Sequence, residues 1–479
     1  MHSKSIEEKF KGLWYRFINS RQSGDLTPEL LEKWAGECGL TNQVATFQDV
    51  GVFNKTSSIV LTVDGGKACF PLVPASGDES WKARRKAHDE QAALWNKVEW
   101  FAPLWVPVGK INALLSSVKN VSKERAIDLF NYHTSTLYTV PFQAVCIEQI
   151  MPFARSLREI VPLAREAYLG AYSGYWAVSV GVLIPAIEGS LTRMVSGISI
   201  HSTIEQKIDY AINRAIITAA RIHFDHMWIP REYLTCDYLF GEDERVFVFE
   251  TFRRWLKSQF FCSTENYQGI TWLNRHMFAH GSVSTWQEPA NFARMIVALT
   301  TLAAIESWYD ESHHVGLWLP AMNEASTLLW QQALLRADNQ MKLKIAEQQL
   351  YHQHGRLVPE MPTDDGVLLR KAHLTQQCMN DLVRPLRDAG WNIRVNETDD
   401  KALYMTVEAS DGRRRLKIAL LYSCATDNDL YRELAEACEF ILYLGAPYHQ
   451  DQYAHGVSVH VGPVLGWQPP KTSGEDNPG

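Results

Sequence analysis

The segment Leu273–Gly281 brings one arginine and two histidines together at short spacing. His276 directly follows Arg275, and His280 comes five positions after the arginine. An imidazole transfers protons near neutral pH. A guanidinium is always charged, and its planar fork of donors holds the non-bridging oxygens of a phosphate and the charge that develops on them. These are the side chains that cleavage of a phosphodiester without a metal ion requires.

Helical geometry determines which face of the helix each of these side chains would lie on. An α-helix turns about 100° per residue, so His276 and His280 share one face and Arg275 lies at its edge. Gly281 predicts that the helix is interrupted directly after His280. An isolated arginine and histidine at this spacing are common by chance. The structural alternative therefore places Arg275 and His276 on the surface and His280 in the core.

The motif lies within residues 120–350, where helical periods dominate and predict a bundle of antiparallel helices. A loop at 282–288 follows the motif and leads to an apolar helix that Pro289 begins. Asn274 stands directly before the arginine. On an earlier helix, Glu188 follows a long apolar run, and a carboxylate at that position needs a partner if it is buried.

Residues 1–110 are mixed in pattern and predict an α+β accessory or sensing module. Residues 6–20 have helical spacing, and Thr27 with the following proline predicts a helix start. Two short apolar runs within 58–70, joined by Asp-Gly-Gly, predict a β-hairpin. Residues 76–85 are predicted to form a solvated loop.

The C-terminal part changes period after a proline-rich linker at 359–366. Residues 367–470 predict a small α/β domain with the order α-β-β-β-α-β, and its first helix covers 368–389. Residues 471–479 are predicted to be a polar tail. The fold class is therefore multi-domain, with a central all-α bundle, a C-terminal α/β domain and the mixed module at the N-terminus.

Composition limits the function classes. The chain has 479 residues, enough for two or three domains, and its net charge of -7 argues against a large surface for duplex nucleic acid. Its eight cysteines form no Cys-x-x-Cys pair, and no signal-peptide core begins the chain. The apolar run at 176–187 is too short to span a bilayer. We therefore expect a cytoplasmic protein without a membrane segment.

The segment from Asn274 to Gly281 resembles the signature of the HEPN superfamily of metal-independent ribonucleases, an arginine, a polar residue, a short gap and a histidine on a helix of an all-α bundle. The resemblance covers about residues 155–310. It implies a homodimer in which the motifs of two subunits form one cleft. It also implies an RNA substrate, no cofactor or metal, and a toxin or antiviral-defence role. The N-terminal and C-terminal additions depart from the minimal family fold, and they would bind a trigger or regulatory partner.

The resemblance assigns roles to five residues. Arg275 would stabilise the transition state. His280 would take the 2′-hydroxyl proton or protonate the leaving oxygen, and a 2′,3′-cyclic phosphate would result. His276 would orient either partner, and Asn274 would support the site. Glu188 is the candidate for the acidic residue that many family members place on an early helix.

Two other hypotheses remain open. In the first, the bundle is non-catalytic and serves dimerisation and the binding of RNA or a partner. In the second, the C-terminal domain resembles restriction-endonuclease-like nucleases, which hold Mg²⁺ with an acidic residue and an acidic-x-Lys pair on adjacent strands. Glu408 and Lys417 are available there, but Arg415 stands where the acidic partner of Lys417 belongs. This broken pattern favours a non-catalytic domain that binds nucleic acid or a partner. The basic run 413–415 with Lys417 would either contact phosphates or form a solvated hairpin end.

One further set has ligand types for zinc. His223 and His226 are three apart and Cys236 follows, but no fourth ligand lies nearby. The two histidines are therefore predicted to lie on a helix surface.

Overall fold

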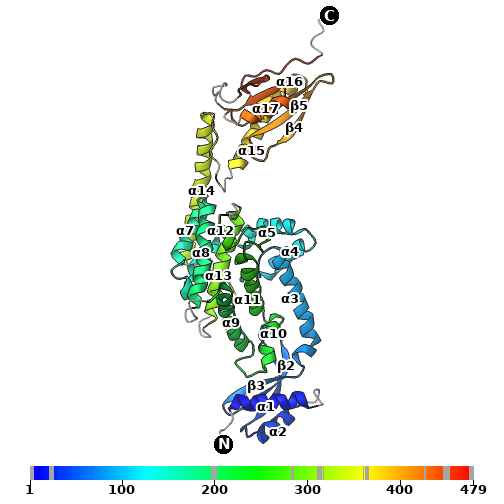
Figure 1. The fold of residues 1–479 in the computed structure, drawn as a ribbon, viewed down its shortest axis with the longest axis vertical. Helices are drawn as coiled ribbons and strands as arrows, with labels where there is room; N and C mark the ends of the chain where they lie inside the picture. The colour runs from blue at the N-terminus through cyan, green and yellow to red at the C-terminus, as the bar shows by residue number, and fades with distance from the viewer. Residues whose placement is uncertain are drawn as a thin grey trace. The chain divides into compact units, whose positions relative to one another are not determined.

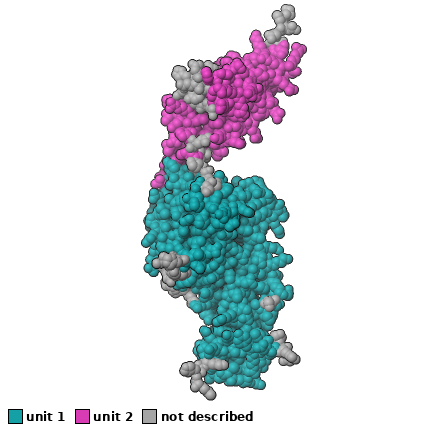
Figure 2. Space-filling model, in the orientation of Figure 1, with its two compact units in different colours: residues 1–334 teal, residues 335–479 magenta. Residues whose placement is uncertain are grey.

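The computed structural model divides the chain into two compact units, residues 1–334 and residues 335–479 (Figures 1 and 2). It describes residues 5–20, 26–195, 202–281, 285–309, 316, 318–359, 361, 366–424, 428–445 and 454–473. The first unit is mostly helical with a small antiparallel sheet near its N-terminus, and the second contains a small mixed sheet. The predicted multi-domain class, with helices in the middle and sheets in both flanking parts, is confirmed at this level.

The N-terminal module has the predicted elements. Its helices are α1 (Ile6–Asn19) and α2 (Pro28–Glu37), and its antiparallel sheet has the order β1 (Val44–Val50), β2 (Thr56–Val63) and β3 (Gly66–Pro71). The Thr27 hydroxyl accepts a hydrogen bond from the Leu30 backbone N–H, which satisfies one free donor at the start of α2. The predicted hairpin is the β2–β3 pair.

Hydrogen bonds join this module to the helical part of the same unit. The Cys69 N–H donates to the Trp228 carbonyl at 2.7 Å, and the Trp228 N–H donates to the Lys67 carbonyl at 2.9 Å. The Trp14 indole N–H donates to the Glu232 carboxylate at 2.8 Å. Because strand β3 and helix α1 are both tied to the chain that follows residue 224, the module and the bundle belong to one unit.

The predicted loop at residues 76–85 is wrong. Helix α3 (Glu79–Lys97) occupies most of it, and the Asp78 carboxylate accepts hydrogen bonds from two backbone N–H groups of its first turn, at 2.9 and 3.1 Å. The helix buries only Ala92 and Trp95. Its sequence therefore has almost no apolar period, and the signal that remains is the cap.

We expect the substitution Asp78→Ala to lower the free energy of unfolding by about 1 kcal/mol, because an N-cap of this type contributes roughly that amount. Chemical denaturation of the full chain measures the change. Glu90→Ala is the matched control, since Glu90 is exposed on the same helix and makes no described hydrogen bond. Equal stability of the two variants would contradict the capping role of Asp78.

Helices dominate the rest of the first unit. They are α4 (Val108–Val118), α5 (Lys123–Leu137), α6 (Val140–Val145), α7 (Val161–Tyr172), α8 (Trp176–Met194), α9 (Ile204–His223), α10 (Cys236–Phe240), α11 (Glu244–Trp255), α12 (Arg275–Ala279) and α13 (Pro289–Ser307). Short helical turns lie between them, namely η1 (Ala75–Gly77), η2 (Cys146–Ile150), η3 (Met151–Phe153), η4 (Arg155–Leu157), η5 (Arg231–Leu234) and η6 (Leu256–Phe260). The predicted helical region is confirmed.

Helix α13 is the central helix of this unit. Seventeen of its nineteen residues are buried, and it packs against α8, α5 and α9. A helix that is apolar on all sides is typical of the middle of a bundle. Pro289 begins it, as predicted, because the missing N–H of proline costs nothing in the first turn.

The long apolar segment before residue 195 forms two helices, α7 and α8. Gly174 separates them with a φ of +88°, which a residue with a β-carbon rarely adopts. Helix α8 is longer than the apolar run seen in the sequence, and by length and composition it would be able to cross a membrane. Half of its apolar window is buried inside the fold, as in a core helix, so this is weak evidence for a membrane span.

The second unit contains the small α/β domain. Helix α14 (Glu324–Gln353) begins in the first unit and ends in the second, so the division between the units lies within this helix, upstream of the predicted linker. Residues 362–365 of that linker lie outside the described residues. The elements that follow are α15 (Gly366–Gln377), η7 (Cys378–Val383), α16 (Arg384–Asp388), β4 (Asn392–Thr398), β5 (Tyr404–Ser410), β6 (Arg415–Leu421), α17 (Asn428–Ala437), β7 (Phe440–Tyr443) and β8 (His460–Pro463).

The C-terminal sheet has the order β4-β5-β6-β7-β8. The first three strands pair antiparallel, and β7 pairs parallel to both β6 and β8. The predicted order α-β-β-β-α-β is present with one more strand, β8. That strand has only four residues and two of them are exposed, so it carries little apolar signal. Within the predicted polar tail, Ser473 donates through its N–H and its hydroxyl to the Asp411 carboxylate.

Candidate active site

Asn274 determines where helix α12 begins. Its side-chain carbonyl accepts hydrogen bonds from the N–H groups of His276 and Met277, both at 2.9 Å. Its side-chain amide donates to the Gln259 carbonyl at 2.7 Å and to the Cys262 carbonyl at 2.9 Å. The side chain is buried, and all four bonds go to backbone groups. Asn274 therefore supports the site by positioning the helix that carries Arg275.

Arg275 is held by the acidic residue that the sequence singled out. The Arg275 Nε donates to Glu188 Oε2 at 2.7 Å, from α12 to the middle of α8. The two side chains are 34% and 38% exposed. This ion pair lies where solvent still reaches it, so the guanidinium is oriented by Glu188 and can also contact an external anion.

The two histidines lie on the same face of the short helix. The His280 N–H donates to the His276 carbonyl at 3.0 Å, which is the helical spacing of four residues. Helix α12 ends at Ala279, and Gly281 has a φ of +62°, as the predicted interruption requires. His276 is partly buried and His280 is exposed. The alternative that places His280 in the core is therefore wrong.

The charges around His276 show how close the four side chains lie. Partial burial lowers the pKa of His276, the neighbouring Arg275 and His280 lower it further, and the Glu188 carboxylate acts in the opposite direction. The imidazole of His276 is therefore neutral at pH 7. A neutral imidazole can accept a proton or a hydrogen bond.

A titration of His276 tests this arrangement. We expect its ring protons to titrate below pH 6.5 in the intact protein, because the pKa is lowered. The sign of the linkage follows: the neutral form stabilises the fold above the unfolded pKa, and this contribution is lost as the pH falls through the folded value. In Arg275→Gln the midpoint is expected to rise, because one positive charge is removed while Glu188 remains. NMR of the His276 ring protons measures both midpoints, and an unchanged midpoint would show that Arg275 lies too far away.

Aromatic side chains pack helix α12 against helix α8, a contact that the sequence did not predict. The Phe278 and Trp286 rings meet edge to face with centroids 5.0 Å apart. A β-carbon at Gly181 would lie 3.5 Å from the Phe278 ring and 3.6 Å from Trp286. At these distances a β-carbon would make ordinary van der Waals contact, so both rings pack on α8 at Gly181 without requiring a glycine there.

Other ligand-type residues belong to structural networks. Within the described parts of the chain, no three His, Cys, Asp or Glu side chains gather around a point that would hold a metal. The prediction that His223 lies on a helix surface is wrong. Its side chain is buried, and Nδ1 lies 2.9 Å from Asp243 Oδ2, which Arg245 also binds. These residues lie where the bundle meets the N-terminal module, since a β-carbon on Gly51 would contact the His223 ring.

The structure thus brings together all five predicted residues at the junction of α12 and α8. It supplies a positioned guanidinium, a neutral imidazole and an exposed imidazole within one short segment. Such a set can bind a phosphate and move protons around it. No protein-family model, no curated protein and no solved structure matches this chain.

Proposed function

We propose that this protein is a metal-independent RNA endonuclease of the HEPN type. The observation that supports the proposal most directly is the placement of Arg275. Glu188 orients its guanidinium at 2.7 Å, beside His276 on the same five-residue helix and His280 directly after it. An ion pair with both side chains about one third exposed stabilises a fold only slightly. A role in binding a phosphate accounts better for a guanidinium positioned in this way.

The chemistry follows from the side chains. An imidazole, for which His280 is the exposed candidate, takes the proton of the RNA 2′-hydroxyl. The 2′-oxygen then bonds to phosphorus, and the bond to the 5′-oxygen breaks. Arg275 holds the non-bridging oxygens as negative charge grows on them. A second group, acting as an acid, must protonate the leaving 5′-oxygen. The products are then a 2′,3′-cyclic phosphate and a 5′-hydroxyl end.

The second proton carrier has two candidate sources. His276 lies on the same face as His280 and has a lowered pKa, so less of it carries the proton that an acid must donate. A second copy of the chain would bring another His280. We therefore propose a homodimer, as in the family that the motif resembles, with the flanking modules binding a trigger or regulatory partner. A cytoplasmic toxin or antiviral-defence effector is the proposed role.

Purified protein incubated with total RNA and with tRNA tests the activity. Cleavage in the presence of EDTA, with products that carry 2′,3′-cyclic phosphate ends, is the expected result. Cleavage that disappears with EDTA would overturn the proposal and favour a metal-dependent nuclease. If no RNA is cut, growth of cells that express wild type or His280→Ala decides: toxicity of wild type alone supports a regulated nuclease, and equal growth contradicts it.

A further inference from the structure

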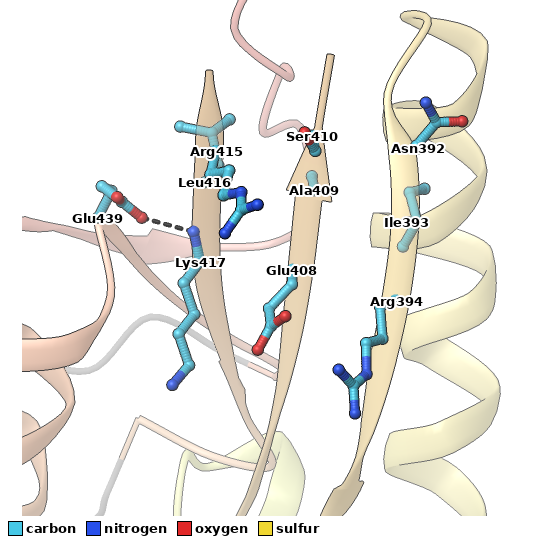
Figure 3. A pocket seen from close by; sticks show the side chains of 10 residues that line it. All are labelled: Asn392, Ile393, Arg394, Glu408, Ala409, Ser410, Arg415, Leu416, Lys417 and Glu439. Carbon is cyan, nitrogen blue, oxygen red and sulfur yellow. Dashed lines mark hydrogen bonds between the residues drawn. The ribbon is translucent and has the colours of Figure 1, made fainter. Parts of the chain in front are cut away.

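A groove of about 510 Å³ lies on one face of the C-terminal sheet (Figure 3). Its floor consists of side chains from three adjacent strands, β4, β5 and β6, together with Glu439 at the start of β7. In the strand register, Arg394 lies opposite Glu408, and Glu408 lies opposite Lys417. One row of three charged side chains therefore crosses the sheet, and Figure 3 shows all three pointing the same way.

A second row lies beside the first. Arg415 is opposite Ser410, two residues along each strand from the first row. Side chains two apart on a strand share one face of the sheet. The groove therefore presents Arg394, Arg415 and Lys417 on the same surface, with the hydroxyl of Ser410 between them.

The sheet leaves this part of the face open. On its other face, Val407 and Leu416 are buried beneath α15 and η7 in one apolar core. On the groove side, helix α17 covers a core that includes Ala419 and Leu421, farther along β6. Arg394, Glu408 and Arg415 are exposed, because no described element covers this end.

Within the part of the chain that the structure describes, the three cations have no acidic partner. Among the described residues, no carboxylate oxygen lies within 4.0 Å of a side-chain nitrogen of Arg394, Arg415 or Lys417, although Glu408 is their neighbour in the strand register. In the same unit, by contrast, the Arg370 guanidinium donates to the Lys401 carbonyl. Three unpaired cations on one grooved face are complementary to the phosphates of a nucleic acid strand.

The two carboxylates in the groove indicate which kind of nucleic acid it would bind. The Glu439 carboxylate accepts a hydrogen bond from the Lys417 backbone N–H at 2.5 Å, so it helps to join the ends of β6 and β7. Glu408 accepts only a long hydrogen bond, 3.4 Å from the Asn396 side-chain amide, and no described group donates to its other oxygen. A carboxylate among phosphate-binding cations repels a phosphate, but it accepts a hydrogen bond from a ribose 2′-hydroxyl. That hydroxyl is the group that distinguishes RNA from DNA.

We propose that this groove binds single-stranded RNA, with Arg394, Arg415 and Lys417 on its phosphates and Glu408 on a 2′-hydroxyl. The proposal rests on the proposed function for the identity of RNA as the biological substrate. It goes beyond that function because it assigns RNA binding to the second unit of the chain, which does not contain the residues proposed to cleave.

Binding of a fluorescent 20-nucleotide RNA to the full chain tests the groove. Every protein carries His280→Ala, so that the probe survives whether or not the wild type cleaves. The triple variant Arg394→Ala, Arg415→Ala, Lys417→Ala is expected to bind about 10- to 100-fold more weakly at 0.1 M salt. Its plot of log affinity against log salt is expected to be shallower by about 2, since each lost phosphate contact removes about 0.7.

The matched control removes the same charges from helices that pack on the opposite face. Lys371, Arg384 and Arg387 are exposed on α15 and α16, and their triple alanine variant is expected to bind like the parent. The two triple variants must have equal unfolding midpoints. If the midpoint of the groove triple variant falls, the single variants Arg394→Ala and Arg415→Ala are measured in its place. Equal RNA binding by the groove variant and the control variant overturns the proposal.

Glu408→Ala tests the choice of RNA. The parent is expected to bind RNA more tightly than DNA of the same sequence, and the variant is expected to lose most of that preference. Unchanged preference overturns the role of Glu408. Failure of the nuclease proposal is a different result: the wild type then cuts no RNA, while the groove variant still weakens binding.

Discussion

His280→Ala is expected to reduce cleavage of RNA by roughly 10²- to 10⁴-fold, the contribution of a general acid or base. Arg275→Ala is expected to reduce it by about 10²- to 10³-fold, because the charge on the non-bridging oxygens loses its positioned donors. Both measurements are made in EDTA, with single-turnover rates on a labelled RNA. The two losses are not expected to add, since both residues act on the same transition state.

The free energy of unfolding distinguishes a variant that has lost catalysis from one that has lost its fold. His280 is exposed, and both side chains of the Arg275–Glu188 pair are about one third exposed, so each variant is expected to unfold within about 1 kcal/mol of wild type. His455→Ala and Arg158→Ala are the matched controls, since both side chains are exposed and lie outside the site. Full cleavage by both site variants would leave the motif without a catalytic role and favour a binding bundle. Loss of cleavage in Lys417→Ala combined with sensitivity to EDTA would favour the C-terminal domain as the nuclease.

Asn274→Ala is expected to lower the free energy of unfolding by about 2–4 kcal/mol. The substitution removes an N-cap, worth about 1 kcal/mol, and leaves the buried carbonyls of Gln259 and Cys262 without donors, at about 1 kcal/mol or more each. Because α12 loses its anchor, Arg275 and His280 are also expected to lose their alignment. We expect kcat to fall at a temperature where the variant is still folded.

Two substitutions sharpen this test. Asn274→Ser keeps an oxygen that can cap the helix but has no amide to reach the two carbonyls, so it is expected to recover about 1 kcal/mol. Asn266→Ala is the matched control, because Asn266 is exposed and its amide contacts only the Ser263 hydroxyl. Equal stability of Asn274→Ala and Asn266→Ala, measured by urea denaturation, would contradict the positioning role.

Local features of the chain were predictable because neighbouring residues determine them. The capped start of α2, the β2–β3 hairpin and the proline at the start of α13 depend on residues within one turn of each other. The same holds for the motif itself. The spacing of His276 and His280 placed them on one face, and Gly281 ended the helix, before any tertiary contact was known. Helix α3 was not predicted, because its only strong local signal was the Asp78 cap.

The other features of the fold and the site depend on packing between segments that are far apart in the sequence. Glu188 and Arg275 are 87 positions apart, and the sequence offered Glu188 only as a carboxylate in need of a partner. Phe278 and Trp286 pack on α8 beside Gly181, a contact between segments that lie far apart in the sequence. In the second unit, the sequence predicted Glu408 and Lys417 on adjacent strands but did not single out Arg394. Only the register of the strands placed them in one row, because cross-strand neighbours depend on how segments pair and not on their spacing along the chain.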